Sequence, residues 1–226
     1  MVGCVVTQRQ PTTKLTMKTI TILASLFMAT YAQSEIKGLP DDSPVRGKWK
    51  LVKQTPEDSE LKKSKAYKKM YNAHVAVQLK ASGMSDAEIK ETIESMEIVA
   101  PGKTTTTYNF EKNTAKIVIK NKGSKSGESF FFKISGKEIQ VIDIMDAKAM
   151  KAMLPAADFA ELQEMFAMKK AKPDHPIFRH MEFAQACLPK SYEFTLSDNN
   201  KNLVLSSGPI KAYDNQTVRY EFVRAE

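Results

Sequence analysis

Hydrophobic and polar residues alternate one by one in several stretches of this 226-residue chain. At 47–52, Trp49 and Leu51 fall on one side of the backbone, and Lys48 and Lys50 fall on the other. Because successive side chains of a strand point to opposite faces of a sheet, this pattern predicts a half-buried β-strand. The same alternation predicts further strands near 104–110, 115–120, 130–134, 138–144, 191–196, 202–206 and 217–224.

Most of these strands are separated only by short polar turns, such as 111–113 and 135–137. Strands joined in this way are antiparallel neighbours. About eight strands with one apolar face each predict a mainly β domain over 47–226, an up-and-down antiparallel barrel with helical insertions. Closure removes the unpaired edges that an open sheet would expose, and a flatter sheet covered by helices is the alternative.

The first insertion follows a helical period instead. We expect a helix over 60–82 and a second helix that begins at a capping box formed by Ser85 and Glu88.

A second helical insertion covers 146–187 and is interrupted at Pro155 and at 172–176. It is rich in methionine, a residue that fills irregular gaps and favours adaptable surfaces. We therefore expect it to pack as core or to form a flexible apolar lid.

The N-terminal residues have the layout of an export signal. Lys18 precedes an uncharged apolar run at 19–29, and the small residues Thr30 and Ala32 follow before the chain turns polar. The run is shorter than the ~20 apolar residues that a bilayer span needs, so we expect a signal peptide.

The chain is thus divided into an export segment, 1–32, a flexible polar lead-in, 33–46, and the barrel domain. Residues 1–16 are unusual ahead of such a signal, and we expect translation to start at Met17. The protein is expected to be exported, to a periplasm or out of the cell, without a stable membrane span.

The charge pattern does not favour nucleic-acid binding. The formal net charge is +8, and the export segment carries three basic residues and no acid, which leaves +5 spread along the remaining chain. Basic residues occur as short doublets rather than as a stripe interleaved with aromatics. Of the two cysteines, Cys4 lies in the export segment, so Cys187 has no partner for an internal disulfide.

Motifs that carry catalysis are missing from the sequence. It contains no G-x-S-x-G, no H-E-x-x-H and no phosphate-binding glycine loop, so we expect no enzyme. The nearest approach to a metal site is Asp174, His175, His180 and Glu182, whose spacing matches no standard zinc pattern. We predict no cofactor and interpret this cluster as a polar loop leading into a helix.

The start of the barrel resembles the lipocalin superfamily and its bacterial exported relatives. The resemblance lies in Gly47-Lys48-Trp49 at the head of the first strand and in the antiparallel meander that ends in an aromatic strand. In that family the tryptophan packs across the closed end of the barrel, and a basic residue of the last strand often covers it. The resemblance therefore implies that Arg219 or Arg224 stacks on Trp49.

The two helical insertions depart from the lipocalin pattern. The first is similar in layout to the helix-turn-helix lid of intracellular lipid-binding proteins.

The resemblance implies a barrel that binds a small hydrophobic molecule. The candidate ligand-binding residues are aromatic side chains that the alternation turns toward one interior: Tyr108, Phe110, Phe130, Phe132, Tyr192, Phe194 and Tyr220. An eight-stranded barrel can also be filled by its own side chains. The alternative function is therefore a secreted protein-interaction module with a plugged barrel, whose Met-rich insertion contacts a protein partner.

Overall fold

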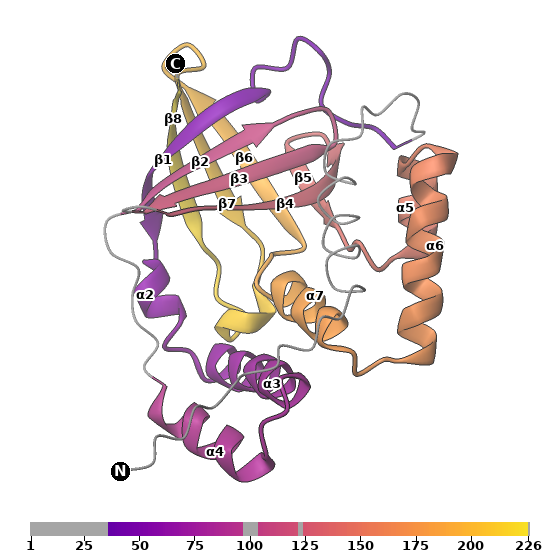
Figure 1. The fold of residues 1–226 in the computed structure, drawn as a ribbon. Coiled ribbons are helices and arrows are strands. Elements are labelled where there is room, and N and C mark those ends of the chain that lie inside the picture. The colour runs from indigo at the N-terminus through magenta and orange to yellow at the C-terminus, as the bar shows by residue number, and fades with distance from the viewer. Residues whose placement is uncertain (1–35, 97–103, 122–123, 226) are drawn as a thin grey trace.

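The computed structural model describes residues 36–96, 104–121 and 124–225, and the predicted export segment, 1–32, lies outside them. The strands form one closed barrel in which neighbours along the chain are antiparallel neighbours in the sheet (Figure 1). In chain order the strands are β1 (Gly47–Thr55), β2 (Thr105–Phe110), β3 (Thr114–Asn121), β4 (Ser124–Ser135), β5 (Glu138–Ile142), β6 (Ser191–Ser197), β7 (Asn202–Ser207) and β8 (Arg219–Arg224). The predicted antiparallel barrel with helical insertions is confirmed.

Pairing of the first and last strands closes the barrel. Trp49 of β1 lies opposite Tyr108 of β2 on one side and opposite Arg224 of β8 on the other. The register between β1 and β8 shifts at Val52, whose side chain is exposed. Such a bulge bends a strand and increases its twist, which helps β1 to pair along both edges.

The helices occupy the two predicted insertions. Between β1 and β2 lie α2 (Asp58–Leu61), α3 (Lys65–Ala81) and α4 (Asp86–Ser95), and between β5 and β6 lie α5 (Ala147–Met153), α6 (Ala156–Ala171) and α7 (Pro176–Ala186). Figure 1 shows α2, α3, α4 and α7 at one end of the barrel and α5 and α6 beside its wall. A 3-10 helix, η1 (Lys211–Tyr213), connects β7 and β8 and is too short to show a period in the sequence.

The first predicted helix, 60–82, is divided into α2 and α3. Ser64 stands between them, and its hydroxyl accepts a hydrogen bond of 3.1 Å from the backbone N–H of Tyr67, so it caps α3. The capping box predicted for α4 is present, because the hydroxyl of Ser85 and the carboxylate of Glu88 each accept from the other's backbone N–H.

Trp49 seals one end of the barrel, which we call the closed end. The indole is fully buried, and its Nε1 donates to the carbonyl of Val45 at 2.7 Å. The guanidinium of Arg224 lies 4.6 Å from the ring centroid and also donates to two backbone carbonyls in the segment before β1. Of the two arginines expected to cover Trp49, Arg224 does so and Arg219 is exposed.

Residues 36–46, the described part of the expected lead-in, contain no helix or strand but pack against the closed end. Leu39 and Val45 are buried in the same core as Trp49. The backbone N–H of Leu39 donates to the carbonyl of Lys112 at 2.7 Å. This segment therefore packs as part of the barrel domain, which the predicted domain start at residue 47 did not include.

A second hydrophobic core lies outside the barrel. There α5 and α6 pack on the wall formed by β4 and β5, and Met150 and Met153 are buried against the outward-facing side chains of Phe131 and Ile142. The idea of a Met-rich lid is therefore wrong for α5 and α6, because these apolar outward positions draw the helices onto the wall. Among the three helices of the second insertion, only α7 also packs against the interior core, where it contributes Phe183.

Candidate functional site

The structure brings together the aromatic residues that were predicted to share one interior. All but Phe194 are buried, and Phe194 is half-buried against the same core. Ring centroids lie 5.9 Å apart for Phe130 and Tyr192, and 6.0 Å apart for Tyr192 and Tyr220. Their shared interior is established, and their role as ligand-binding residues stays a prediction.

The interior becomes more polar from one end to the other. Near the closed end, Phe110 and Phe132 have ring centroids 6.1 Å apart and exposed fractions of 1% and 0%. Rings packed in this way fill the closed end. Toward the helix-covered end, which we call the mouth, the buried rings include three tyrosines, Tyr108, Tyr192 and Tyr220. Phe130 packs on Tyr192 with centroids 5.9 Å apart, and Phe222 packs on Tyr108 at 4.9 Å. The mouth is therefore the part of the interior where hydroxyl groups lie among the aromatic rings.

The rings of these three tyrosines are neighbours, with centroids 6.5 Å apart for Tyr108 and Tyr220 and 6.0 Å apart for Tyr192 and Tyr220. Burial raises the pKa of Tyr108 and of Tyr192 well above the usual value, and the nearby Tyr220 adds to the rise in both. In the described part of the chain none of the three hydroxyls makes a hydrogen bond, and none is among the fully enclosed unpaired atoms, so each keeps some accessible surface. Buried polar groups without a partner are uncommon in folded proteins. The mouth thus offers three hydroxyls to whatever occupies it.

A further aromatic group covers the mouth. Tyr67 of α3 stacks on Tyr213 of η1 with centroids 5.8 Å apart and lies against Phe183 of α7 at 5.6 Å. Burial raises the pKa of the thiol of Cys187, directly after α7, to about 12, although the hydroxyl of Tyr213 donates a hydrogen bond to its sulfur, which acts in the opposite direction. A thiol with that pKa stays protonated at neutral pH, which disfavours a nucleophilic role.

The loop between β7 and β8 holds α3 over the mouth. The carboxylate of Asp214, which follows η1, accepts hydrogen bonds from the backbone N–H groups of Lys65 at 3.0 Å and Ala66 at 3.1 Å. The hydroxyl of Ser64 donates to the carbonyl of Ala212 at 2.9 Å. Because the first N–H groups of a helix have no partner within the helix, this distant loop caps α3 and fixes its position.

Some inward-facing positions at the mouth ends of β2, β3 and β4 are not buried. Strand register places Thr106, Ile119, Ser126 and Glu128 on the inward face, in line with the buried interior residue Ile117. Ser126 and Glu128 are nevertheless exposed, and Thr106 and Ile119 are half-buried. Inward-facing side chains therefore reach solvent at this part of the rim.

Glu128 places a carboxylate among these inward-facing positions that reach solvent. Burial is the main cause of the raised pKa values of Tyr67 and Tyr108, and the charge of Glu128 contributes to both. Its carboxylate is therefore close to the cap and to the interior tyrosines. It has no hydrogen bond or ion pair with any residue that the structure describes.

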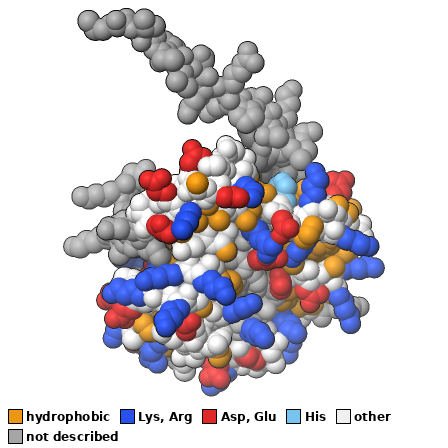
Figure 2. All heavy atoms as spheres, turned by 90° about the horizontal axis from the view of Figure 1, so that it is seen from below, with side chains coloured by type: hydrophobic (Ala, Val, Ile, Leu, Met, Phe, Trp, Pro, Cys, Tyr) orange, Lys and Arg blue, Asp and Glu red, His pale blue; other side chains and the backbone are white. Residues whose placement is uncertain are grey.

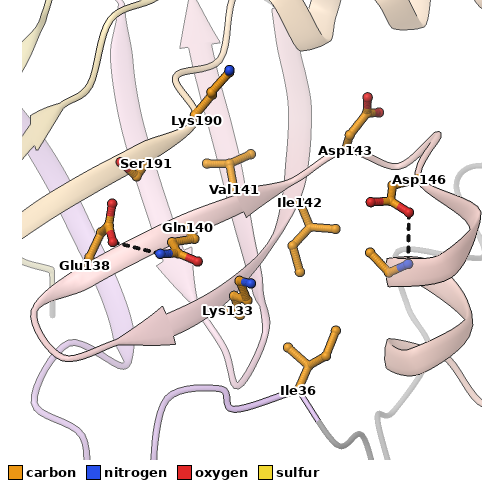
Figure 3. Close-up of a pocket in the computed structure, with 11 residues that line it drawn as sticks. Ile36, Lys133, Glu138, Gln140, Val141, Ile142, Asp143, Asp146, Lys190 and Ser191 are labelled. Atoms are coloured by element: carbon orange, nitrogen blue, oxygen red, sulfur yellow. Dashed lines mark hydrogen bonds between the residues drawn. The ribbon is translucent and has the colours of Figure 1, made fainter.

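A separate groove of about 470 Å³ lies on the outer wall, beside β5 and the start of α5 (Figure 3). Its carboxylates are engaged locally. Glu138 accepts a hydrogen bond of 2.8 Å from Gln140, Asp143 accepts one of 2.8 Å from the N–H of Met145, and Asp146 caps α5. Because these groups already have partners, we place the candidate site at the mouth.

Figure 2 views the molecule from the helix-covered end, where Lys and Arg side chains are interspersed with Asp and Glu. Hydrophobic side chains appear between them. Among the helices of the described residues, none is both long enough and apolar enough to cross a membrane.

The four residues considered for a metal site have other roles in the structure. Asp174 and Glu182 both form ion pairs with Arg179. His175 caps the N-terminus of α7, and His180 packs against a histidine of α3. Within the described ranges, no three His, Cys, Asp or Glu side chains are grouped in a way that would hold a metal ion.

The polar part of the mouth was not predicted from the sequence. A signal was available for Glu128, because it lies two residues before Phe130 in the inward set of β4. Tyr67 and Tyr213 reach the mouth only through the packing of α3 and η1, and a local pattern does not report such packing.

No protein-family model matches the chain, and no curated protein is found to be similar to it. The geometry of the mouth is thus the basis for inferring a function.

Proposed function

We propose that this chain is an exported, lipocalin-like binding protein that holds a small, largely hydrophobic molecule at the mouth of its barrel. The main support is the group of three neighbouring buried tyrosines whose hydroxyls have no hydrogen-bond partner among the described residues, next to inward-facing positions that reach solvent. Sites for small molecules are typically concave and mostly apolar, with a few placed polar groups. The apolar part of the ligand lies against the rings, and its polar group faces the hydroxyls.

The closed end supports the lipocalin-like part of the proposal. Gly47 has a φ of +107°, which a side chain would strain, and Arg224 covers Trp49 as the resemblance implied. The filled layer of Phe110 and Phe132 next to it places the ligand in the outer part of the interior. Of the predicted ligand-binding residues, we therefore assign the contacts to the tyrosines and the supporting floor to these phenylalanines.

The alternative is a protein-interaction module with a plugged barrel, whose Met-rich insertion would contact a protein partner. Met150, Met153, Met165 and Met181 are buried in the outer core. Their packing is explained within the chain, so they give no support to a docking surface.

Export is the other part of the proposal, and it is supported by the apolar run at 19–29 and the small residues that follow it. We expect the protein isolated from its native cell to begin at Gln33. If the signal peptidase instead uses the small residues Ala32 and Ser34 and cuts after Ser34, the protein begins at Glu35. Mass measurement of the intact protein tests this, and a mass that includes residues 17–32 would contradict it.

Binding is tested with the neutral fluorescent probe N-phenyl-1-naphthylamine and its displacement by 1-decanol. We expect the folded protein to enhance the probe's emission and decanol to reverse the enhancement. Tyr220→Phe removes one hydroxyl without changing the ring, and loss of a hydrogen bond of ordinary strength weakens decanol binding by about threefold or more.

Tyr71→Phe is the matched control, because it removes the hydroxyl of a half-buried tyrosine on α3 that is not one of the three interior tyrosines. Its decanol affinity should equal that of the unmodified chain. A folded protein that binds neither the probe nor decanol refutes the proposed function.

A further inference from the structure

The mouth also indicates which class of hydrophobic molecule it accepts. We propose, as an extension of the binding function above, that the ligand carries a protonated amine that pairs with the carboxylate of Glu128. Three features support this: the position of that carboxylate, the lack of a basic partner for it among the described residues, and the tyrosine rings near it.

Glu128 lies at the rim of an aromatic interior. It is on the inward face of β4, opposite Ile117 and two residues before Phe130, both of which are buried in the interior core. The residue is exposed, so its carboxylate meets solvent at the edge of this apolar surface. A cation bound at this point pairs with the carboxylate while the apolar part of the ligand lies against the interior.

No basic side chain of the described chain pairs with Glu128. Lys120 of β3 and Lys125 of β4 lie opposite each other in the register, on positions that alternate with the inward ones. They therefore point to the outside of the wall. Among the described residues, the carboxylate therefore has no basic partner that would compete with a ligand.

Asp58 of α2 is the other carboxylate whose charge reaches the mouth. After burial, its charge adds to the raised pKa of Tyr220. Asp58 already forms an ion pair of 2.6 Å with Lys62. Glu128 is therefore the acceptor that remains available to a bound cation.

The neighbouring rings favour the same class of ligand. Tyr67 and Tyr108 are close enough to Glu128 to feel its charge. The faces of aromatic rings attract cations, and the attraction grows when the cation is partly shielded from water. A ligand with a carboxylate would instead be repelled by Glu128, so this mouth selects against fatty acids.

The test compares three ligands with the same ten-carbon chain: decylamine, 1-decanol and decanoate. Each displaces N-phenyl-1-naphthylamine from the full chain at pH 7, below its aggregation concentration. An exposed ion pair contributes modestly, so we expect decylamine to bind about fivefold more tightly than decanol, and decanoate to bind more weakly than decanol.

Glu128→Gln should remove the preference for the amine and leave decanol affinity within about twofold. The matched control is Glu193→Gln, the same change on an exposed residue of β6 that alternates with the inward-facing Tyr192. Its preference for decylamine should equal that of the unmodified chain.

The outcomes separate the two proposals. If decanol fails to displace the probe, or no probe binds, the proposed function falls and the amine inference with it. If decanol binds but decylamine has no advantage, or the advantage persists in Glu128→Gln, the binding function stands and the amine inference is refuted.

Discussion

His74, on α3, is enclosed between α3 and α7, where its ring stacks on that of Phe183 with centroids 5.3 Å apart. The ring of His180 lies 5.2 Å away, and in the described part of the molecule Nδ1 of His74 is buried without a partner. Burial, together with the nearby His180, lowers the pKa of His74 from its usual 6.5. The neutral imidazole is therefore the form that packs between the helices.

This environment predicts a loss of stability on acidification. The unfolded chain takes up the proton near pH 6.5 while the native His74 resists it, so the contribution is intact above that pH and is lost as the pH falls below it. We expect the decrease in unfolding free energy between pH 7.5 and 5.5, measured by urea denaturation, to be smaller in His74→Gln. An identical decrease in both proteins would contradict this assignment.

At the closed end, Arg224 acts through both its charge and its shape. Its guanidinium stacks on Trp49 and donates to the carbonyls of Pro44 and Arg46. A lysine retains the charge but loses the planar fork, so Arg224→Lys should lower the free energy of unfolding by about 1 kcal/mol. Urea denaturation measures the change, and Arg219→Lys, in an exposed ion pair with Glu221, should have little effect.

At the scale of elements, the two helical insertions have different roles. The first insertion and α7 cover the mouth, whereas α5 and α6 form the outer core with β4 and β5. The physical cause is the pattern of apolar side chains on both faces of these strands. Phe130 and Phe132 face the interior, while Phe131 and Ile142 face the helices.

This arrangement predicts that the outer core affects stability without affecting binding. Met153→Ala leaves a cavity beneath α5, and it should lower the free energy of unfolding by about 2–3 kcal/mol. Probe binding at the mouth should stay unchanged. Lys151→Ala, at an exposed position of the same helix, is the control, and equal effects of the two substitutions on stability would argue against the outer core.

At the scale of the whole molecule, the barrel has a filled closed end and a more polar mouth. Trp49 is the only tryptophan of the chain and lies at the closed end. Trp49 lies opposite Tyr108 in the register, but its indole is fully buried and is held by the carbonyl of Val45 and by Arg224. A ligand that reaches only the tyrosine hydroxyls therefore does not change the exposure of the indole.

We expect saturation with 1-decanol to leave the emission maximum of Trp49 unchanged, while unfolding in urea shifts it to the red. A ligand that entered as far as Phe110 and Phe132 would displace rings in the layer next to the indole. A shift on decanol binding would thus show that the site lies deeper than proposed.

Much of the barrel could be predicted from local sequence patterns. The alternation that begins at Trp49 and recurs through β8 predicted the strands, and short turns predicted their antiparallel order. The same alternation predicted which aromatic side chains share the interior. It did not predict the depth at which each ring lies, so the division between a floor of phenylalanines and a mouth of tyrosines was missed.

The sequence by itself thus determined the strands, their meander, the inward aromatic set and the capping box of α4, because each depends on residues a few positions apart. Only the tertiary structure decided which arginine covers Trp49, that α5 and α6 lie on the wall, and that Tyr67 and Tyr213 meet over the mouth. It also decided that Glu128 has no partner among the described residues. These features depend on distances between segments far apart in the chain and on how side-chain volumes fill the space between them, which a local pattern does not encode.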